Sequence, residues 1–289
     1  MISEKRKGPA FMIAASICWS FGGICIKLVP WGAMSIIGVR ALLAAVVFAI
    51  YRKSAKAEIT PGNILAALCL SATTILFVFA NKLTTAAAAI LLQFSAPIFI
   101  IIIQLLIYRQ KPRPGGIIAV SVTLVGMLLF FADQLFSGRS DAGGTLGNII
   151  AIISGLTFAG VFVCNKRPDV DTEQSLYIGF LLNTAVGLPF VFFQAAADPA
   201  AYTADPVAWG AILFMGIVQV GLAYLFFSKG IKGTSALLAC LITAMEPVLN
   251  PLWVAFATGE VPGKFAVFGG IIIVATVVLY NIWVEKHPE

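Results

Sequence analysis

Charged residues are scarce in this sequence: only 11% of its 289 residues are Asp, Glu, Lys or Arg, whereas 60% are hydrophobic. A soluble domain carries about 25% charged residues, because they cover the surface that faces water. The composition therefore excludes an ordinary soluble protein and predicts an all-α polytopic membrane protein. The net charge of +6 does not indicate nucleic-acid binding, because the basic residues lie in short clusters between apolar runs.

Catalytic and metal-binding motifs are also lacking. The single histidine lies at position 287, and the chain has no HExxH motif, no Walker motif and no nucleophile–base pair. Five cysteines lie in apolar runs without metal-ligand spacing, which predicts free packing residues; they are Cys18, Cys25, Cys69, Cys164 and Cys240. We therefore expect no enzyme, no cofactor and no metal site. A channel signature is missing, and a scaffold membrane protein remains the alternative to a transporter.

Apolar segments of spanning length are what the sequence has in abundance. A spanning helix needs about 20 mostly apolar residues, and prolines, glycines and charges separate ten such segments. The short links between several of them predict antiparallel neighbours. The ten segments are 9–28, 33–51, 63–81, 84–108, 115–133, 145–164, 174–195, 206–228, 234–257 and 263–284.

Lysine and arginine are distributed unevenly among the links. With the N-terminus in the cytoplasm, fourteen of them fall on the inside and four on the outside. Cytoplasmic loops of membrane proteins carry such an excess. The distribution predicts a protein of the cell (inner) membrane whose N- and C-termini are both cytoplasmic. The inside residues lie at 5–7, 52–56, 109–113, 166–167, 229–232 and 286.

An internal repeat relates the two parts of the chain. Residues 82–112 match residues 232–262 at a shift of 150, so that Pro97 aligns with Pro247. The first apolar segment also recurs, at a shift of 137, which favours a retained helix over a cleaved signal peptide.

The repeat predicts two five-helix halves, residues 1–137 and 138–289. Because five is odd, the second half enters the membrane from the opposite side. Inverted repeats of this kind are a recurring transporter architecture, with the binding site between the halves near the membrane midplane.

Three stretches carry a resemblance to a known family: GVRALLAA in the second segment, TTAAAAILLQFSAPIF in the fourth and TSALLACLITAMEPVLNPLWVAFATGE in the ninth. With them the chain resembles the EamA-type family of the drug/metabolite transporter superfamily over nearly its whole length. The resemblance implies a secondary transporter, an exporter of amino acids, amines or related metabolites that works by alternating access. It does not specify the substrate.

Glu246 is the most informative polar residue, because it lies about halfway along the ninth segment and directly before Pro247. A carboxylate at the bilayer centre costs at least about 2.5 kcal/mol on insertion scales, so we expect it to face a cavity or a partner. There it either carries a proton or pairs with a cationic substrate; a structural hydrogen bond is the alternative. Helical spacing predicts that Thr243, Asn250 and Trp253 share its face.

Other residues complete the candidate site. Arg40 is a charge within the second segment; it either pairs with Glu246, holds a substrate carboxylate or, as the resemblance implies, has a structural or gating role. Pro97, Pro247 and Pro251 are predicted to kink their helices. Polar and aromatic candidates for the cavity, the latter suited to organic cations or flat ligands, are Gln93, Trp19, Ser20, Thr157, Phe158 and Tyr224.

The expected partners are a small-molecule substrate, the lipid bilayer and, if the Glu246 carboxyl titrates, protons. Two fused halves already supply a pseudo-symmetric pair, so we expect a monomer.

Overall fold

The computed structural model describes residues 2–135, 144–197, 205–258 and 263–287, and every regular element within these ranges is a helix. The predicted boundary at 137/138 lies outside them. The elements before it are α1 (Ile2–Ser20), α2 (Gly22–Lys27), α3 (Ala33–Arg52), α4 (Pro61–Leu83), α5 (Ala86–Gln93), α6 (Ala96–Leu106), α7 (Pro114–Phe130) and α8 (Ala132–Leu135). Those after it are α9 (Gly144–Cys164), α10 (Thr172–Ala197), α11 (Pro206–Phe214), the π-helix η2 (Met215–Leu222), α12 (Ala223–Gly233), α13 (Ala236–Thr243), α14 (Met245–Thr258) and α15 (Lys264–Lys286).

Helices occupy all ten predicted apolar segments, although not all of them reach spanning length. Eight helical stretches are long and apolar enough to cross a membrane, and two apolar stretches, Pro114–Phe130 and Ala236–Asn250, are shorter. The 17 residues of α7 extend about 26 Å at 1.5 Å per residue, slightly less than the hydrocarbon thickness of about 30 Å. The chain is thus a multi-pass membrane protein.

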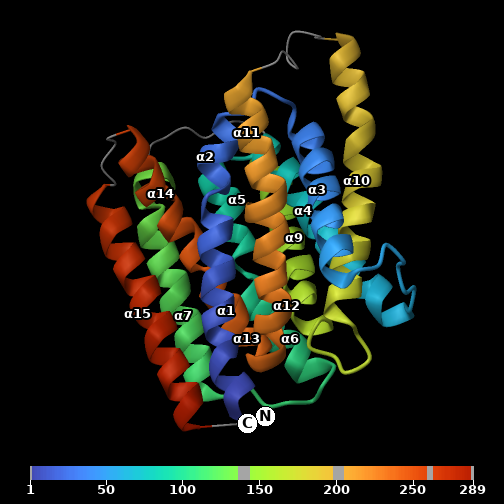
Figure 1. Ribbon diagram of the computed structural model, residues 1–289. Coiled ribbons are helices and arrows are strands. Elements are labelled where there is room, and N and C mark those ends of the chain that lie inside the picture. Colours follow the sequence, from blue (N-terminus) through green and yellow to red (C-terminus); the bar gives the residue numbers. More distant parts are fainter. Residues whose placement is uncertain (1, 136–143, 198–204, 259–262, 288–289) are drawn as a thin grey trace.

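Helices from the two parts of the sequence pack against each other in an exchanged pattern (Figure 1). Helix α1 contacts α12, α13 and α14, whereas α9 contacts α4, α5 and α6. Helix α3 packs along α10, and α7 packs along α15. The first helix of each part therefore packs against the later helices of the other part.

The α3–α10 pair comes unusually close through two glycines. A Cβ on Gly38 would collide with the backbone of Gly187, and the reverse also holds. Small residues let helix backbones approach in this way, and close packing is what holds helices together once they lie in lipid.

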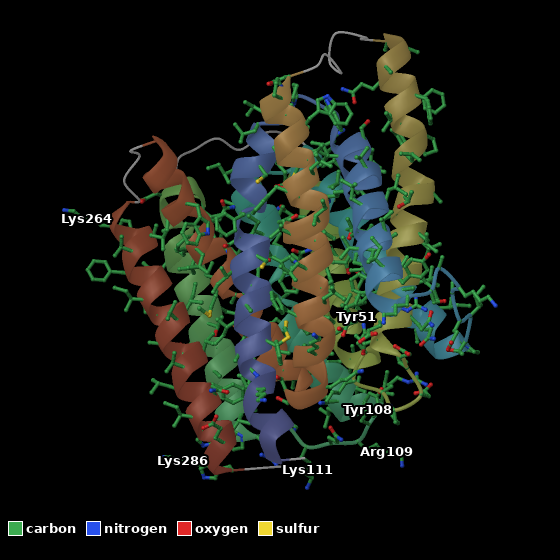
Figure 2. The ribbon with its side chains drawn as sticks, viewed as in Figure 1. Tyr51, Tyr108, Arg109, Lys111, Lys264 and Lys286 are labelled. Carbon is green, nitrogen blue, oxygen red and sulfur yellow. The ribbon has the colours of Figure 1, made fainter. Side chains whose placement is uncertain are left out.

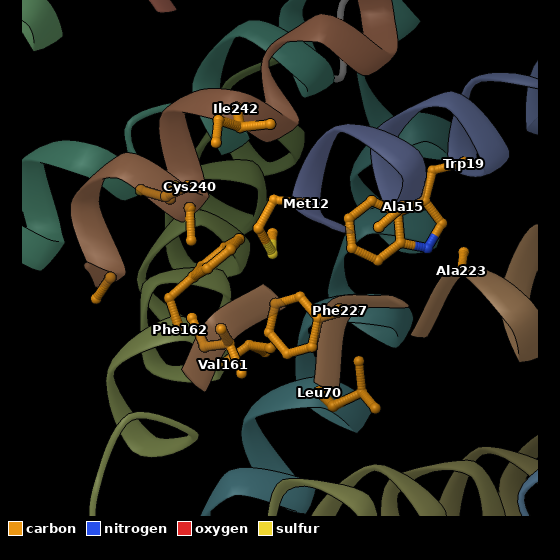
Figure 3. Packing of buried hydrophobic residues seen from close by; sticks show 14 of the residues in the cluster. Met12, Ala15, Trp19, Leu70, Val161, Phe162, Ala223, Phe227, Cys240 and Ile242 are labelled. Carbon is orange, nitrogen blue, oxygen red and sulfur yellow. The ribbon is translucent and has the colours of Figure 1, made fainter. Parts of the chain in front are cut away.

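The centre of the molecule is a dense apolar cluster (Figure 3). The members labelled in Figure 3 come from α1, α4, α9, α12 and α13, and further members come from α3, α6, α7, α10, η2 and α15. Phe162 and Phe227 are almost fully buried. Polar contacts supplement this packing: the Ser71 hydroxyl of α4 donates to Asn183 Oδ1 of α10 at 2.8 Å. Such interhelical bonds stabilise membrane proteins by about 0.6 kcal/mol on average.

Cationic side chains gather at one end of the bundle. Figure 2 shows Arg109, Lys111 and Lys286 at the end where α1 begins and α15 finishes, and Lys264 toward the opposite end. The beginning of α1 and the end of α15 lie at this same end of the bundle.

Candidate functional site

Glu246 lies at a break in the helical segment that carries it. Helix α13 ends at Thr243 and α14 begins at Met245, which places Glu246 in the first turn of α14. Pro247 has no N–H to donate to the carbonyl of Thr243, so a continuous helix would leave that carbonyl unpaired. The positive end of the α14 dipole favours a negative charge in the first turn.

A second break occurs at the corresponding place in the first part of the chain. Helix α5 ends at Gln93, and Pro97 is the second residue of α6. Gly155 of α9 lies against this break: a Cβ on it would sit 2.8 Å from the carbonyl oxygen of Gln93 and 2.6 Å from the Ser95 hydroxyl. Both interrupted helices therefore expose backbone in the protein interior, which is tolerated at membrane depth only where protein or water surrounds it.

The first helix supports the break beside Glu246. The Ser16 hydroxyl of α1 is buried and lies 3.3 Å from the Ile242 carbonyl oxygen, to which it donates, and 3.0 Å from that of Met12. A polar side chain from another helix thus donates a hydrogen bond to a backbone carbonyl at the end of α13.

Glu246 lies within electrostatic reach of two groups, the Arg40 guanidinium of α3 and the Tyr224 hydroxyl of α12. The Arg40 guanidinium and the Tyr224 hydroxyl also lie within electrostatic reach of each other. All three side chains keep part of their surface exposed, so solvent-sized space reaches them. A carboxyl, a guanidinium and a phenol are therefore close enough to influence one another's charge.

Aromatic rings form one wall of this arrangement. The rings of Trp19 and Tyr224 meet edge to face with centroids 4.9 Å apart, and Phe180 contacts Tyr224 at 5.4 Å. Trp19 is 7% exposed, and its indole nitrogen meets no hydrogen-bond partner among the described residues. A buried donor without a partner suits an acceptor supplied by a ligand.

Further contacts form where α1 ends. Trp253 donates from its indole nitrogen to the Ser20 hydroxyl at 2.7 Å, and its ring stacks on Phe21 at 4.7 Å. The Gln219 amide of η2 donates to the Trp19 carbonyl, one residue before the end of α1, at 3.3 Å.

A second polar group surrounds the α5–α6 break. The Gln93 amide donates to the Ser154 hydroxyl at 2.8 Å, which in turn donates to the Thr73 carbonyl. The Thr73 hydroxyl lies 2.9 Å from that of Thr157 and donates to it. These bonds join α4, α5 and α9 into a network that begins at the interrupted helix.

Aromatic contacts connect the two polar groups. Phe158 packs against Phe162 at 4.9 Å, Phe162 against Phe227 at 5.6 Å, and Phe227 against Trp19 at 6.1 Å. The candidate residues of the two parts of the chain are therefore joined through the core rather than scattered over the bundle.

Some predicted placements differ in the structure. Thr243 does not share a helix with Glu246, because the chain breaks at Ala244; its hydroxyl is fully buried and donates to the Cys240 carbonyl at 2.6 Å. Asn250 and Trp253 do lie on α14 with Glu246. Pro251 lies inside α14, which continues through it without a break; its side chain lies outside the described part.

Several residues of the site were not among the sequence candidates: Phe21, Gln219, Thr73 and Ser154. A signal existed for Gln219, which is an amide within an apolar segment. Phe21 gave no such signal, because phenylalanine is abundant in the chain at 22 residues.

No group of three or more His, Cys, Asp or Glu side chains in the described ranges is arranged to hold a metal ion. The five cysteines are free thiols, as their spacing predicted.

Comparisons with known proteins agree on one family. The chain is 27% identical over 264 residues to YwfM of Bacillus subtilis, an uncharacterized transporter, covering 86% of this chain and 85% of that protein. It is 25% identical over 223 residues to an uncharacterized transporter of Archaeoglobus fulgidus, covering 74% of each. A crystal structure at 18% identity shares the fold with a TM-score of 0.80 over 98% of this chain and 99% of that one. The model of the EamA-like transporter family matches residues 6–132 and 145–282. The chain therefore belongs to the EamA-like transporter family, within the drug/metabolite transporter superfamily.

Proposed function

We propose that this protein is a secondary transporter that exports small organic molecules, with Glu246 as the group that holds either a proton or a cationic substrate. The observation that carries the proposal is the position of the Glu246 carboxyl: it lies in the first turn of α14, just after a helix break, within electrostatic reach of Arg40 and Tyr224. An ionisable residue at this depth marks a substrate or proton path by default. Membership in a transporter family favours transport over catalysis.

The proposed architecture is ten spans in two inverted five-helix repeats, residues 1–137 and 138–289. The exchanged packing supports it, because α1 relates to α13–α14 as α9 relates to α5–α6. The two separate matches to the family model support the same division. Because one chain already contains both repeats, it needs no second copy to supply the other one, and we propose that it works as a monomer.

Alternating access would then be a rocking of α1 and α14 against α4 and α9. The broken helices are suited to this motion because each contributes two short rigid pieces. The contacts of Trp253 with Ser20 and Phe21 would hold the site closed on one side.

A carboxyl that binds either a proton or an organic cation, but not both at once, couples the movement of protons across the membrane to the movement of the cation. A cation entering the site displaces the proton, and a proton entering from the other side releases the cation. The rings of Trp19 and Tyr224 would stabilise the bound cation by cation–π attraction of about 0.5–2 kcal/mol.

The proposed orientation places both termini in the cytoplasm and the membrane as the cell (inner) membrane. The cations at the α1 end of the bundle support it, because Lys and Arg accumulate on the cytoplasmic side.

Flux into proteoliposomes tests the function. Purified protein is reconstituted, and uptake of labelled amines and amino acids is measured with an imposed pH gradient, with protein-free liposomes as control. We expect uptake of at least one organic cation that reverses when the gradient is reversed. Absence of flux for every amine and amino acid at every gradient would contradict the proposal.

A further inference from the structure

A polar pocket lies apart from the Glu246 site, between α6, α7, α13 and α15. Its volume is about 340 Å³, and Gln110, Lys111 and Arg113 line it together with Ser235 and Tyr280. The link between α6 and α7 supplies its cationic side. Figure 2 shows Lys111 at the end of the bundle where the termini lie.

The backbone of this link is shaped to bring its side chains over the pocket. Arg109 adopts a left-handed conformation with φ of 54°, and the Gln110 N–H donates to the Gln104 carbonyl at 2.9 Å. The bond closes a seven-residue turn, one residue wider than the usual six-residue closure at the end of a helix. A left-handed residue is common where a helix ends, although glycine is the usual residue there. The turn folds Gln110 back over the end of α6, beside Gln104 in the pocket wall.

The electrostatics of the pocket favour an anion. Lys111 and Arg113 contribute two positive charges, and no Asp or Glu is among the described residues that line it. The N-terminal ends of α7 and α13 both meet there: Arg113 and Ser235 are the residues that precede the two helices. Helix N-termini carry partial positive charge, which adds to that of the side chains.

The two helices joined by the cationic link carry exposed apolar side chains close to it in the sequence. Leu106 and Ile107, at the end of α6, are each 71% exposed, and Ile118 of α7 is 62% exposed. In a membrane protein such side chains face lipid tails. A ligand with a charged headgroup and apolar tails could therefore place the headgroup among the pocket cations and its tails against the outer surface of α6 and α7.

We propose that the pocket binds the phosphate group of an anionic phospholipid, whose acyl chains lie along the outer faces of α6 and α7. Lysine, arginine and helix N-termini recognise phosphate, and basic pockets between membrane helices hold anionic headgroups. A free phosphate would use the same donors but would gain nothing from Leu106, Ile107 and Ile118.

Lipid titration of the full-length protein tests this proposal. Protein delipidated in a neutral detergent is titrated with phosphatidylglycerol or phosphatidylcholine in mixed micelles, and separately with inorganic phosphate. The unfolding temperature and the lipid retained in native mass spectrometry are recorded. A ligand that binds the folded state raises the unfolding temperature.

We expect phosphatidylglycerol to stabilise the protein more than phosphatidylcholine or inorganic phosphate does. Lys111→Gln should raise the dissociation constant for phosphatidylglycerol about fivefold, and the double variant K111Q/R113Q should raise it about thirtyfold. Each Lys or Arg near an anionic lipid contributes about 1 kcal/mol, which corresponds to about fivefold in the dissociation constant. The single variant keeps the 2.7 Å bond from Arg113 Nη1 to the His287 carbonyl, so it separates binding from folding.

The matched control is K53Q/K56Q, which removes two cations from another loop, and it should bind phosphatidylglycerol like the unmodified protein. Equal stabilisation by the two lipids, or unchanged binding in K111Q and K111Q/R113Q, would overturn the proposal. Equal protection by inorganic phosphate would also overturn it and assign the pocket to a soluble phosphate. None of these readouts depends on transport.

Discussion

The indole nitrogen of Trp253 and the hydroxyl of Ser20 lie 2.7 Å apart and join α14, which carries Glu246, to the end of α1. Phe21 stacks on the same indole. These contacts link residues more than 230 positions apart in sequence. Any movement that separates α14 from α1 must break them, so they bear directly on access to Glu246.

Replacing Ser20 by alanine should loosen α14. The Trp253 hydrogen bond is lost, which lowers the free energy of unfolding by about 0.6 kcal/mol, the usual value for an interhelical bond in a membrane. A cysteine placed at Asn250, in a background without the native cysteines, should then react faster with a water-soluble thiol reagent.

Ser228→Ala is the matched control, because the Ser228 hydroxyl is equally buried but bonds only to Leu225 of its own helix. Equal labelling rates in the two variants would show that the Ser20 contact does not restrain α14.

Glu246→Gln should reduce flux to the level of protein-free liposomes and remove its dependence on the pH gradient. The amide keeps the size of the side chain but neither releases a proton nor attracts a cation. Because a neutral amide is easier to bury than a carboxylate, the unfolding temperature should not fall. Proteoliposome flux and thermal unfolding measure the two effects.

Glu285→Gln, at an exposed position near the end of α15, serves as the control and should transport normally. Full, pH-dependent flux in Glu246→Gln would remove this carboxyl from the mechanism.

Cysteines introduced at Lys53 and Lys111 should react with a membrane-impermeant reagent in inside-out vesicles and not in intact cells. Both positions are exposed and belong to the basic loops, which we place in the cytoplasm. A cysteine at Lys264 should show the reverse, since Lys264 lies toward the other end of the bundle. Labelling of Lys53 and Lys111 variants from outside intact cells would invert the topology.

Gly187→Val should destabilise the protein by about 1–3 kcal/mol, as overpacking of a tight contact does. The valine side chain would collide with the backbone of Gly38 and force α3 and α10 apart. Gly210→Val is the control, because a Cβ on Gly210 meets no atom within 4 Å. Thermal unfolding in detergent compares the two, and similar unfolding temperatures would argue against a tight α3–α10 contact.

The helices themselves were predictable from the sequence, because a bilayer demands long apolar stretches and tolerates few alternatives. Pro97 and Pro247 marked the neighbourhood of the two breaks, since a missing N–H disturbs the same place in any helix. Sequence spacing did not reveal that the break precedes Glu246 and so removes Thr243 from its face. Periodicity assumes an uninterrupted helix, and Ala244 interrupts it.

The partners of the candidate residues were harder to predict than the residues. Trp19, Ser20 and Trp253 were all candidates, yet nothing in one sequence states that Ser20 accepts from Trp253 or that Gln219 reaches the Trp19 carbonyl. These contacts depend on which helices become neighbours. The exchanged packing of distant helices decides that, and no local pattern encodes it.

The same exchanged packing sets an order of events during synthesis. Helix α1 emerges from the ribosome first, but α12, α13 and α14, its main partners, are made late, with only α15 after them. Until then Ser16 lacks the Ile242 carbonyl, and Ser20 lacks the Trp253 indole that completes its surroundings. The nascent protein must therefore carry an incomplete first helix through most of translation, exposed to lipid, insertase or chaperone, and it reaches its native contacts only when nearly the whole chain has been made.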